Sequence, residues 1–161
     1  MLVVGILASD LTQKIRSKTL LIESKEQKSS MLYRLSKDLA SVNTEKEIIV
    51  IAVEYIHAEF DSVSVFLFPN ADNKLDYLNA LPDISLANID FDIASWSFNH
   101  KKSAGKGTQN LPHEAYLYMP LTCSLGTIGV LVLRPSIFQN IFISEHYQLL
   151  DTVVNHILQA L

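Results

Sequence analysis

Cysteine is nearly missing from this sequence, since Cys123 is the one cysteine among 161 residues. A single thiol excludes a disulfide within the chain and a metal site built from a cysteine cluster. Basic residues are also few, with 13 lysines and arginines against 17 acidic residues and a formal charge of −4. That balance argues against a surface that attracts nucleic acid, so we expect no nucleic acid among the partners.

An apolar run long enough to cross a membrane is missing as well. The apolar stretch Met1–Ala8 is much shorter than the about 20 residues of a spanning helix. Lys14, Arg16 and Lys18 follow it closely, which is the order expected where a spanning helix leaves the membrane on the cytoplasmic side. Two interpretations of residues 1–9 stay open: the end of a transmembrane helix, or an apolar helix start that packs on its own domain.

What the sequence does contain is enough apolar surface for one folded domain, with 48% hydrophobic and 19% charged residues. Residues 4–39 predict one long helix without proline. Along it runs a heptad seam with a polar middle: Val4, Ala8, Leu11, Ile15, Lys18, Ile22, Lys25, Ser29, Leu32, Ser36 and Leu39. Residues 10–41 are therefore interpreted as a juxtamembrane signalling helix that pairs with a second copy, or as an amphipathic helix that packs on its own domain.

Residues 42–161 predict one α+β domain. Thr44 and Glu47 form a capping box, which favours a helix of about 16 residues over a strand in the β-branched run that follows. The later expected elements are strands over 62–68, 75–78, 115–123 and 127–133, a helix from Asp90 or Asp92 to His100, and a helix from Ser144 to Leu161. This order predicts a largely antiparallel sheet of about five to six strands flanked by helices. Because the last helix ends within its apolar stripe, we expect the domain to belong to a longer chain.

Three stretches carry a resemblance to a known family. In residues 94–112, Trp96 and His100 precede an Ala-Gly-Lys-Gly-Thr loop and a Leu-Pro pair. The motif Leu-Tyr-Met-Pro-Leu follows at 117–121, and the glycine-containing apolar strand Gly-Thr-Ile-Gly-Val-Leu-Val-Leu at 126–133. Together with the helix segment 32–40, these stretches make the chain resemble the GAF region of KdpD-type sensor histidine kinases.

That resemblance implies a GAF fold in a bacterial inner-membrane kinase that responds to potassium limitation or osmotic stress. It implies that this domain lies on the cytoplasmic side and transmits a signal through dimeric terminal helices. The implied partners are a second copy, the adjacent transmembrane and kinase domains of the same chain, and a response regulator reached through the kinase core. The parent would be an ATP-dependent protein histidine kinase, whereas this fragment is expected to have no activity of its own.

Nine residues are candidates for a small-molecule pocket: Phe66, Phe68, Tyr77, Trp96, His100, Gly105, Gly107, Thr108 and Tyr118. The aromatic side chains offer apolar walls, while backbone N–H groups and a hydroxyl in the glycine loop can meet an anion or amide. The same residues have a plain structural interpretation, in which glycine shapes the loop and the aromatics fill the core. The domain is then a ligand-free dimerisation and signal-relay spacer.

Catalytic and metal sites are not indicated. Lys106 is followed by Gly107 rather than by serine or threonine, which excludes a phosphate-binding P-loop. The five histidines lack zinc-ligand spacing, and Cys123 is expected to be an inert thiol. We therefore predict no catalytic residue, no metal and no cofactor, and we leave any small-molecule ligand unidentified. A small enzyme on this scaffold remains the least favoured alternative.

Overall fold

The structure, a computed structural model, describes residues 27–78, 88–135 and 144–161. The chain divides into two compact units, Met1–Lys37 and Asp38–Leu161. Residues 27–40 are helical, which confirms the last part of the long helix predicted over 4–39. The remainder of that helix, including the predicted membrane end at 1–9, lies outside the described residues.

The described residues of the second unit form three helices and five strands. In chain order these are α2 (Glu45–Phe60), β1 (Val63–Pro69), β2 (Leu75–Tyr77), α3 (Phe91–His100), β3 (Ala104–Gly105), β4 (Leu117–Cys123), β5 (Gly126–Arg134) and α4 (Ser144–Ala160). The strands make one sheet in the order β2-β1-β5-β4-β3, and every neighbouring pair is antiparallel. The predicted α+β class and antiparallel sheet are thus confirmed.

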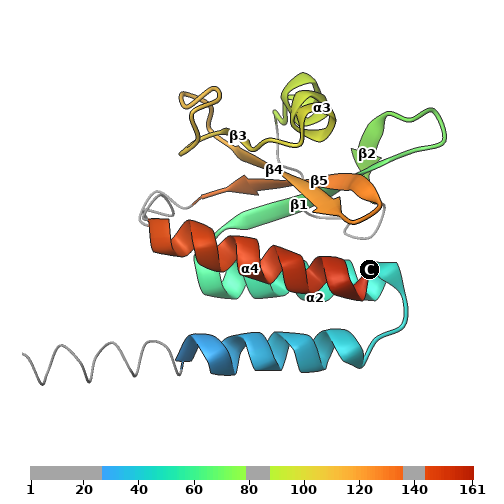
Figure 1. Cartoon of the computed structure of the whole chain (residues 1–161), viewed down its shortest axis with the longest axis vertical. Helices are drawn as coiled ribbons and strands as arrows, with labels where there is room; N and C mark the ends of the chain where they lie inside the picture. The colour runs from blue at the N-terminus through green and yellow to red at the C-terminus, as the bar shows by residue number, and fades with distance from the viewer. Residues whose placement is uncertain (1–26, 79–87, 136–143) are drawn as a thin grey trace, which may run out of the picture. The chain divides into compact units, whose positions relative to one another are not determined.

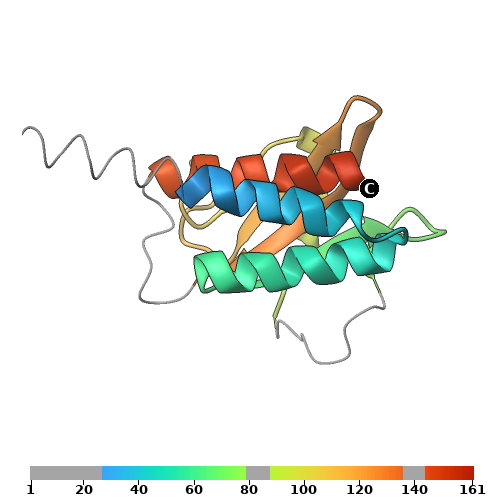
Figure 2. The same cartoon turned by 90° about the horizontal axis from the view of Figure 1, so that it is seen from below.

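Helices cover both faces of the sheet. Figure 1 shows α3 on one face and α2 with α4 on the other, and Figure 2 shows α2 and α4 side by side. Because β5 is central and covered on both faces, its consecutive residues Val130–Leu133 are all 0% exposed. The alternation of side chains along the strands therefore decides which residues can meet α3 and which can meet α2 and α4.

The capping box predicted at the start of α2 is present. The Thr44 hydroxyl donates to a carboxylate oxygen of Glu47 at 2.8 Å and accepts from the Glu47 backbone N–H at 3.3 Å. Helix α2 then runs for 16 residues to Phe60, and its C-cap residue Asp61 adopts a left-handed conformation with φ of 45°. Its buried face consists of Ile48, Ile49, Ala52, Val53, Ile56 and Phe60. The cap and this buried stripe override the strand propensity of the β-branched run.

The outer edge of β4 is only partly covered. Within the described residues, β3 pairs with Leu117 and Tyr118 and leaves the strand from Met119 to Cys123 without a neighbour on that side. Pro120 lies in this stretch and has no backbone N–H to offer. The Tyr116 carbonyl points outward, because it accepts from the Lys106 N–H at 2.9 Å, and strand alternation gives Pro120 the same outward orientation.

Candidate functional site

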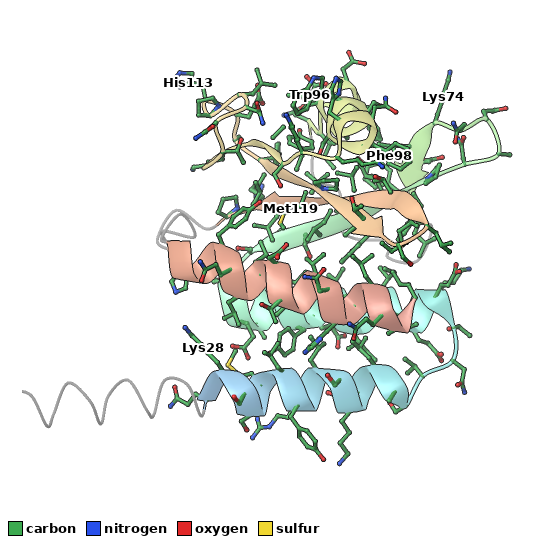
Figure 3. The ribbon with its side chains drawn as sticks, in the orientation of Figure 1. Lys28, Lys74, Trp96, Phe98, His113 and Met119 are labelled. Atoms are coloured by element: carbon green, nitrogen blue, oxygen red, sulfur yellow. The ribbon has the colours of Figure 1, made fainter. Side chains whose placement is uncertain are left out.

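The face of the sheet beneath α3 is filled by the side chains of this chain. A buried cluster there consists of Val65, Leu67, Ile93, Ala94, Ala104, Tyr116, Tyr118, Val130 and Val132. Trp96 and Phe98 pack against it and are partly buried. Both side chains come from α3, as Figure 3 shows. Two of the predicted pocket residues, Trp96 and Tyr118, thus meet on this face as parts of a packed core.

Tyr118 ties the centre of β4 to the start of α3. Its side chain is fully buried, and its hydroxyl oxygen accepts a hydrogen bond from the Asp90 backbone N–H at 3.1 Å. Burial raises the pKa of the Tyr118 phenol, and the neighbouring charge of Asp90 contributes in the same direction. Asp90 in turn caps α3, since its side chain accepts from the N–H groups of Asp92 and Ile93. The phenol therefore holds the capping residue of α3 in place.

Trp96 and His100 share one side of α3, as their spacing predicted. Their rings stack with centroids 4.5 Å apart and planes inclined by 19°. The Nδ1 atom of His100 lies 2.9 Å from the Trp96 carbonyl oxygen, and the imidazole is exposed. The stack is a local feature of the end of the helix, with one ring partly buried and the other in solvent.

In the glycine-containing loop over residues 103–112, several polar groups form hydrogen bonds with other groups of the same loop. Gly105 N–H donates to the Asn110 carbonyl at 2.7 Å, and Thr108 N–H donates to the Gly105 carbonyl at 3.1 Å. The Thr108 hydroxyl lies 2.8 Å from the Gly105 carbonyl and 2.7 Å from the Asn110 carbonyl. Gly105 and Gly107 have φ of 92° and 80°, in the left-handed region that favours glycine. These bonds support the structural interpretation of Gly105 and Thr108, while Gly107 is exposed.

The other predicted pocket residues lie elsewhere. Phe66 and Phe68 alternate with Val65 and Leu67 of the α3-side cluster, so they face the opposite layer of α2 and α4. Tyr77 on β2 makes an edge-to-face contact with Phe91, with ring centroids 5.7 Å apart. The structure therefore does not bring the nine candidates together around one pocket.

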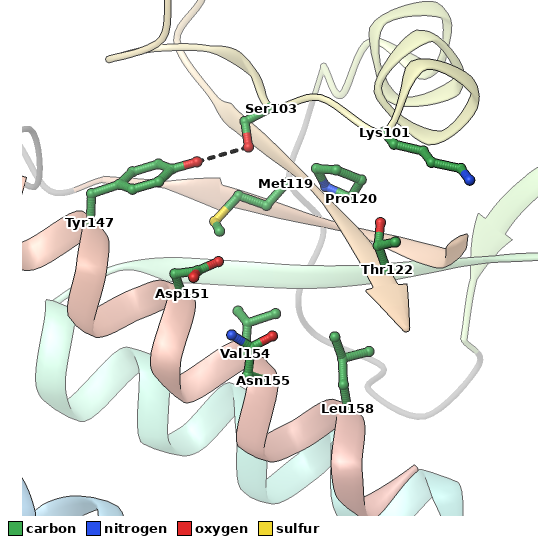
Figure 4. Close-up of a pocket in the computed structure, with 10 residues that line it drawn as sticks. All are labelled: Lys101, Ser103, Met119, Pro120, Thr122, Tyr147, Asp151, Val154, Asn155 and Leu158. Atoms are coloured by element: carbon green, nitrogen blue, oxygen red, sulfur yellow. Dashed lines mark hydrogen bonds between the residues drawn. The ribbon is translucent and has the colours of Figure 1, made fainter. Parts of the chain in front are cut away.

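Two clefts are lined by described residues. The first has a volume of about 230 Å³ and lies between α4, β4 and the segment after α3, as Figure 4 shows. Its polar lining residues are Lys101, Ser103, Thr122, Tyr147, Asp151 and Asn155. The second has a volume of about 440 Å³, and its lining includes Phe68, Ile128 and Leu161. Phe68 is the one predicted pocket residue that lines either of these two clefts.

Comparisons with known proteins decide the family. No family model matches the chain. The sensor protein KdpD of Escherichia coli is 32% identical over all 161 residues, which span 18% of the length of that relative. The crystal structure of the GAF domain of the potassium sensor histidine kinase KdpD from Escherichia coli superposes with a TM-score of 0.71 at 30% identity, covering 82% of this chain and 91% of that one. The chain belongs to the KdpD GAF domains.

More distant structures agree on the fold alone. The GAF domain of an Acinetobacter phosphoenolpyruvate-protein phosphotransferase superposes with a TM-score of 0.62 at 14% identity, covering 83% of this chain and 92% of that one. The resemblance to the KdpD-type GAF region and the predicted GAF-like architecture are confirmed by the two Escherichia coli comparisons.

Among the described residues of this KdpD GAF domain, no helix is long and apolar enough to cross a membrane, and no group of three or more histidine, cysteine or acidic residues could hold a metal.

Sequence reasoning missed the polar cleft of the KdpD GAF domain. The relevant signal was present, because Tyr147, Asp151 and Asn155 recur every four residues and so lie on one side of α4. The apolar stripe of α4 predicts its packing, whereas the polar residues beside that stripe carry no signal that a cleft covers them. Their partners on β4 and after α3 depend on the tertiary fold, which no local spacing reveals.

Proposed function

We propose that this KdpD GAF domain is the regulatory module of a membrane-bound two-component sensor histidine kinase that controls potassium uptake under potassium limitation or osmotic stress. The observation that carries the proposal is the 30% identity to the GAF domain of a potassium sensor histidine kinase over 91% of that structure. In this proposal the domain lies on the cytoplasmic side of the inner membrane. The parent is an ATP-dependent kinase, and this domain itself catalyses nothing.

The proposed mechanism is mechanical and runs through the terminal helices. Helix α4 is anchored to the domain by Leu150, Val153, Val154 and Ile157, each 3% exposed or less. A change in the sheet or in α3 therefore displaces a packed helix rather than a loose tail, because buried interfaces shift between discrete arrangements. A second copy pairs through the terminal helices, the kinase core reads the displacement of α4, and the core then phosphorylates its response regulator.

A ligand-free relay is the second candidate, and the packed face beneath α3 favours it. Tyr118, Ala94 and Ala104 are 0% exposed there, so these described side chains fill the space that the aromatic candidates were expected to line. In this version the signal arises in the membrane or in another domain, and the GAF domain passes it on.

The experiment that tests the proposed function changes the phase of the helix that follows the domain. One residue inserted after Leu161 in the full-length parent rotates the following helix by about 100°, whereas a seven-residue insertion nearly preserves its phase. We expect the one-residue insertion to abolish the effect of potassium on autophosphorylation in membrane vesicles and the seven-residue insertion to retain it. Equal potassium responses in both insertion variants and the parent would overturn the proposal.

A further inference from the structure

The larger of the two clefts lies at the end of the domain where α2 begins and α4 ends. Figures 1 and 2 show these two helix ends near each other. The cleft has a volume of about 440 Å³. Apart from Glu45, the described residues that line it are apolar: Ile49, Phe68, Pro69, Leu78, Ile128 and Leu161. Segments that are distant in sequence thus meet around one apolar cleft.

The ring of Phe68 forms a fixed wall of this apolar cleft. A Cβ atom added to Gly129 would lie 3.0 Å from Cδ1 and 3.2 Å from Cε1 of that ring. The missing side chain at Gly129 therefore leaves the space that the ring occupies against the backbone of β5. The ring is packed on this side, is partly buried and also borders the cleft.

A β-bulge in β5 brings Ile128 to the same cleft. The pairing of β4 with β5 shifts between Leu121 and Thr122, so Ile128 is an extra residue without a partner on β4. Simple alternation from Val130, which belongs to the cluster beneath α3, would place Ile128 on the α3 face. A bulge re-aims the side chain beside it, and Ile128 lines the cleft together with Phe68. Bulges of this kind are frequent next to functional sites.

The size of the apolar cleft favours a small molecule over a macromolecule. Small-molecule clefts measure about 300–1,000 Å³ and have mostly apolar and aromatic walls. An apolar cavity of about 150 Å³ is sufficient to bind benzene, so the volume of about 440 Å³ leaves room for two rings. A stable protein–protein interface takes about 20–30 residues a side, many more than the seven described residues that line this cleft.

We propose that the apolar cleft binds an uncharged aromatic molecule of one or two rings, which packs against Phe68. The binding free energy comes from removal of apolar ligand surface from water and from the contact between the rings. An anionic ligand finds no counter-charge, because the one charged residue of the described lining is Glu45. A cationic ligand gains little, because Glu45 is exposed and exposed charge pairs contribute little free energy.

The consequence for regulation rests on the proposed function. Leu161 lines the cleft and continues the hydrogen bonding of α4, since its N–H donates to the Ile157 carbonyl at 3.1 Å. A ligand that contacts Leu161 therefore favours one arrangement of the helix through which the signal is proposed to leave. Binding itself requires only the cleft, so it can be tested independently of kinase regulation.

The test is a titration of the 161-residue chain with indole, which has two rings, and with phenol, which has one. We expect saturable binding in isothermal titration calorimetry for at least one of them. In the NMR spectrum, the methyl resonances of Ile49, Ile128 and Leu161 should shift, while those of Leu125 stay in place. Leu125 is 95% exposed in the turn between β4 and β5 and does not line the cleft.

Matched variants separate the cleft from the general surface. Leu161→Asp should weaken binding by at least about tenfold, because the ligand would cover a carboxylate that water otherwise solvates. The same change at Leu125, Leu125→Asp, should leave binding unchanged. Phe68→Leu keeps an apolar side chain but removes the ring, and should weaken binding roughly two- to tenfold. Thermal unfolding of each variant verifies that it is folded.

The charge of the ligand provides a second control. Indole-3-acetate adds a carboxylate to the same rings and should bind at least about tenfold more weakly than indole. Four results would overturn the proposal: no saturable binding of indole or phenol, binding that Leu161→Asp does not weaken, equal loss in Leu125→Asp, or cleft resonances that shift with protein concentration alone. The last result would mean that a second copy occupies the cleft. None of these results changes the helix-phase experiment on the parent kinase, so failure here is distinguishable from failure of the proposed function.

Discussion

Gly105 occupies a position that no other residue fits well. Its φ is 92°, and a Cβ atom added there would overlap the Tyr116 carbonyl oxygen. We expect Gly105→Ala to lower the free energy of unfolding by more than about 2 kcal/mol, because backbone strain and a backbone clash add. Gly126 is the matched control: its φ is 123°, but no heavy atom of residues 27–78, 88–135 or 144–161 lies within 4 Å of an added Cβ.

Urea unfolding followed by circular dichroism measures this difference. Gly126→Ala should cost only the backbone strain, on the order of 1 kcal/mol. Equal losses in the two alanine variants would contradict the role assigned to the Tyr116 contact.

Loss of the side-chain hydroxyl should lower the stability of the domain at one tyrosine, Tyr118, but not at another, Tyr55. Tyr118→Phe leaves the Asp90 N–H without its acceptor and should cost about 1–2 kcal/mol of unfolding free energy. The Tyr55 hydroxyl is buried and has no hydrogen-bond partner among the described residues, so Tyr55→Phe should be neutral or slightly stabilising. Thermal unfolding of both variants checks this, and hydrogen exchange at Ile93 should rise in Tyr118→Phe alone. A larger loss from Tyr55→Phe than from Tyr118→Phe would contradict it.

Tyr55 also makes stability depend on alkaline pH. Burial, with a smaller contribution from the Glu59 charge, raises the pKa of Tyr55 to about 12. Because the folded-state pKa lies above the ordinary value of 10.0, the associated stability is fully present below about pH 10 and is lost as the pH rises toward 12. Absorbance titration of phenolate should show one step near pH 12 that Tyr55→Phe removes and Tyr33→Phe retains. Loss of that step in Tyr33→Phe instead would refute the assignment.

At the scale of the single element, the capping box of α2 should contribute measurably to the free energy of unfolding. Thr44→Ala removes both side-chain bonds to Glu47 and should lower the free energy of unfolding by about 1 kcal/mol. Ser41→Ala serves as the control, because its hydroxyl bonds the Asp38 carbonyl outside α2. Differential scanning calorimetry at neutral pH compares them, and a larger loss in Ser41→Ala would argue against the cap.

Elements with local signals were predictable, whereas those set by distant contacts were not. Thr44 and Asp90 mark helix starts by the chemistry of their own side chains, so α2 and α3 were found within a residue or two. Strand β3 has only two residues and exists because Ala104 and Gly105 meet Tyr118 and Leu117 across the sheet. No pattern within residues 103–112 reveals that pairing.

For a related reason, the sequence could not show that the nine candidate residues lie apart in the fold. The period of two along β1 shows that Phe66 and Phe68 share a face, but which helices cover that face depends on the whole fold. Trp96 and His100 were placed correctly relative to each other, since a spacing of four on one helix is sufficient. The sequence shows which residues share a face of one strand or helix, but it does not show which other elements pack against that face.

At the scale of the whole molecule, the heptad seam over residues 4–39 predicts a dimer. Sedimentation velocity should show that the 161-residue chain associates as its concentration rises, because the seam residues pair between copies. A chain that begins at Val42 lacks the seam and should remain a monomer at the same concentrations. If the shorter chain dimerises, another surface mediates the pairing. If the 161-residue chain stays monomeric at every concentration, the seam does not pair.

The proline on the open side of β4 has a consequence for the solubility of the molecule. An unpaired strand is a template onto which another extended chain can add, and aggregation begins at such templates. Pro120 removes a donor from the middle of the uncovered stretch, so an incoming strand cannot form a continuous ladder there. In a concentrated solution identical copies meet often, and this one residue discourages them from joining sheet to sheet.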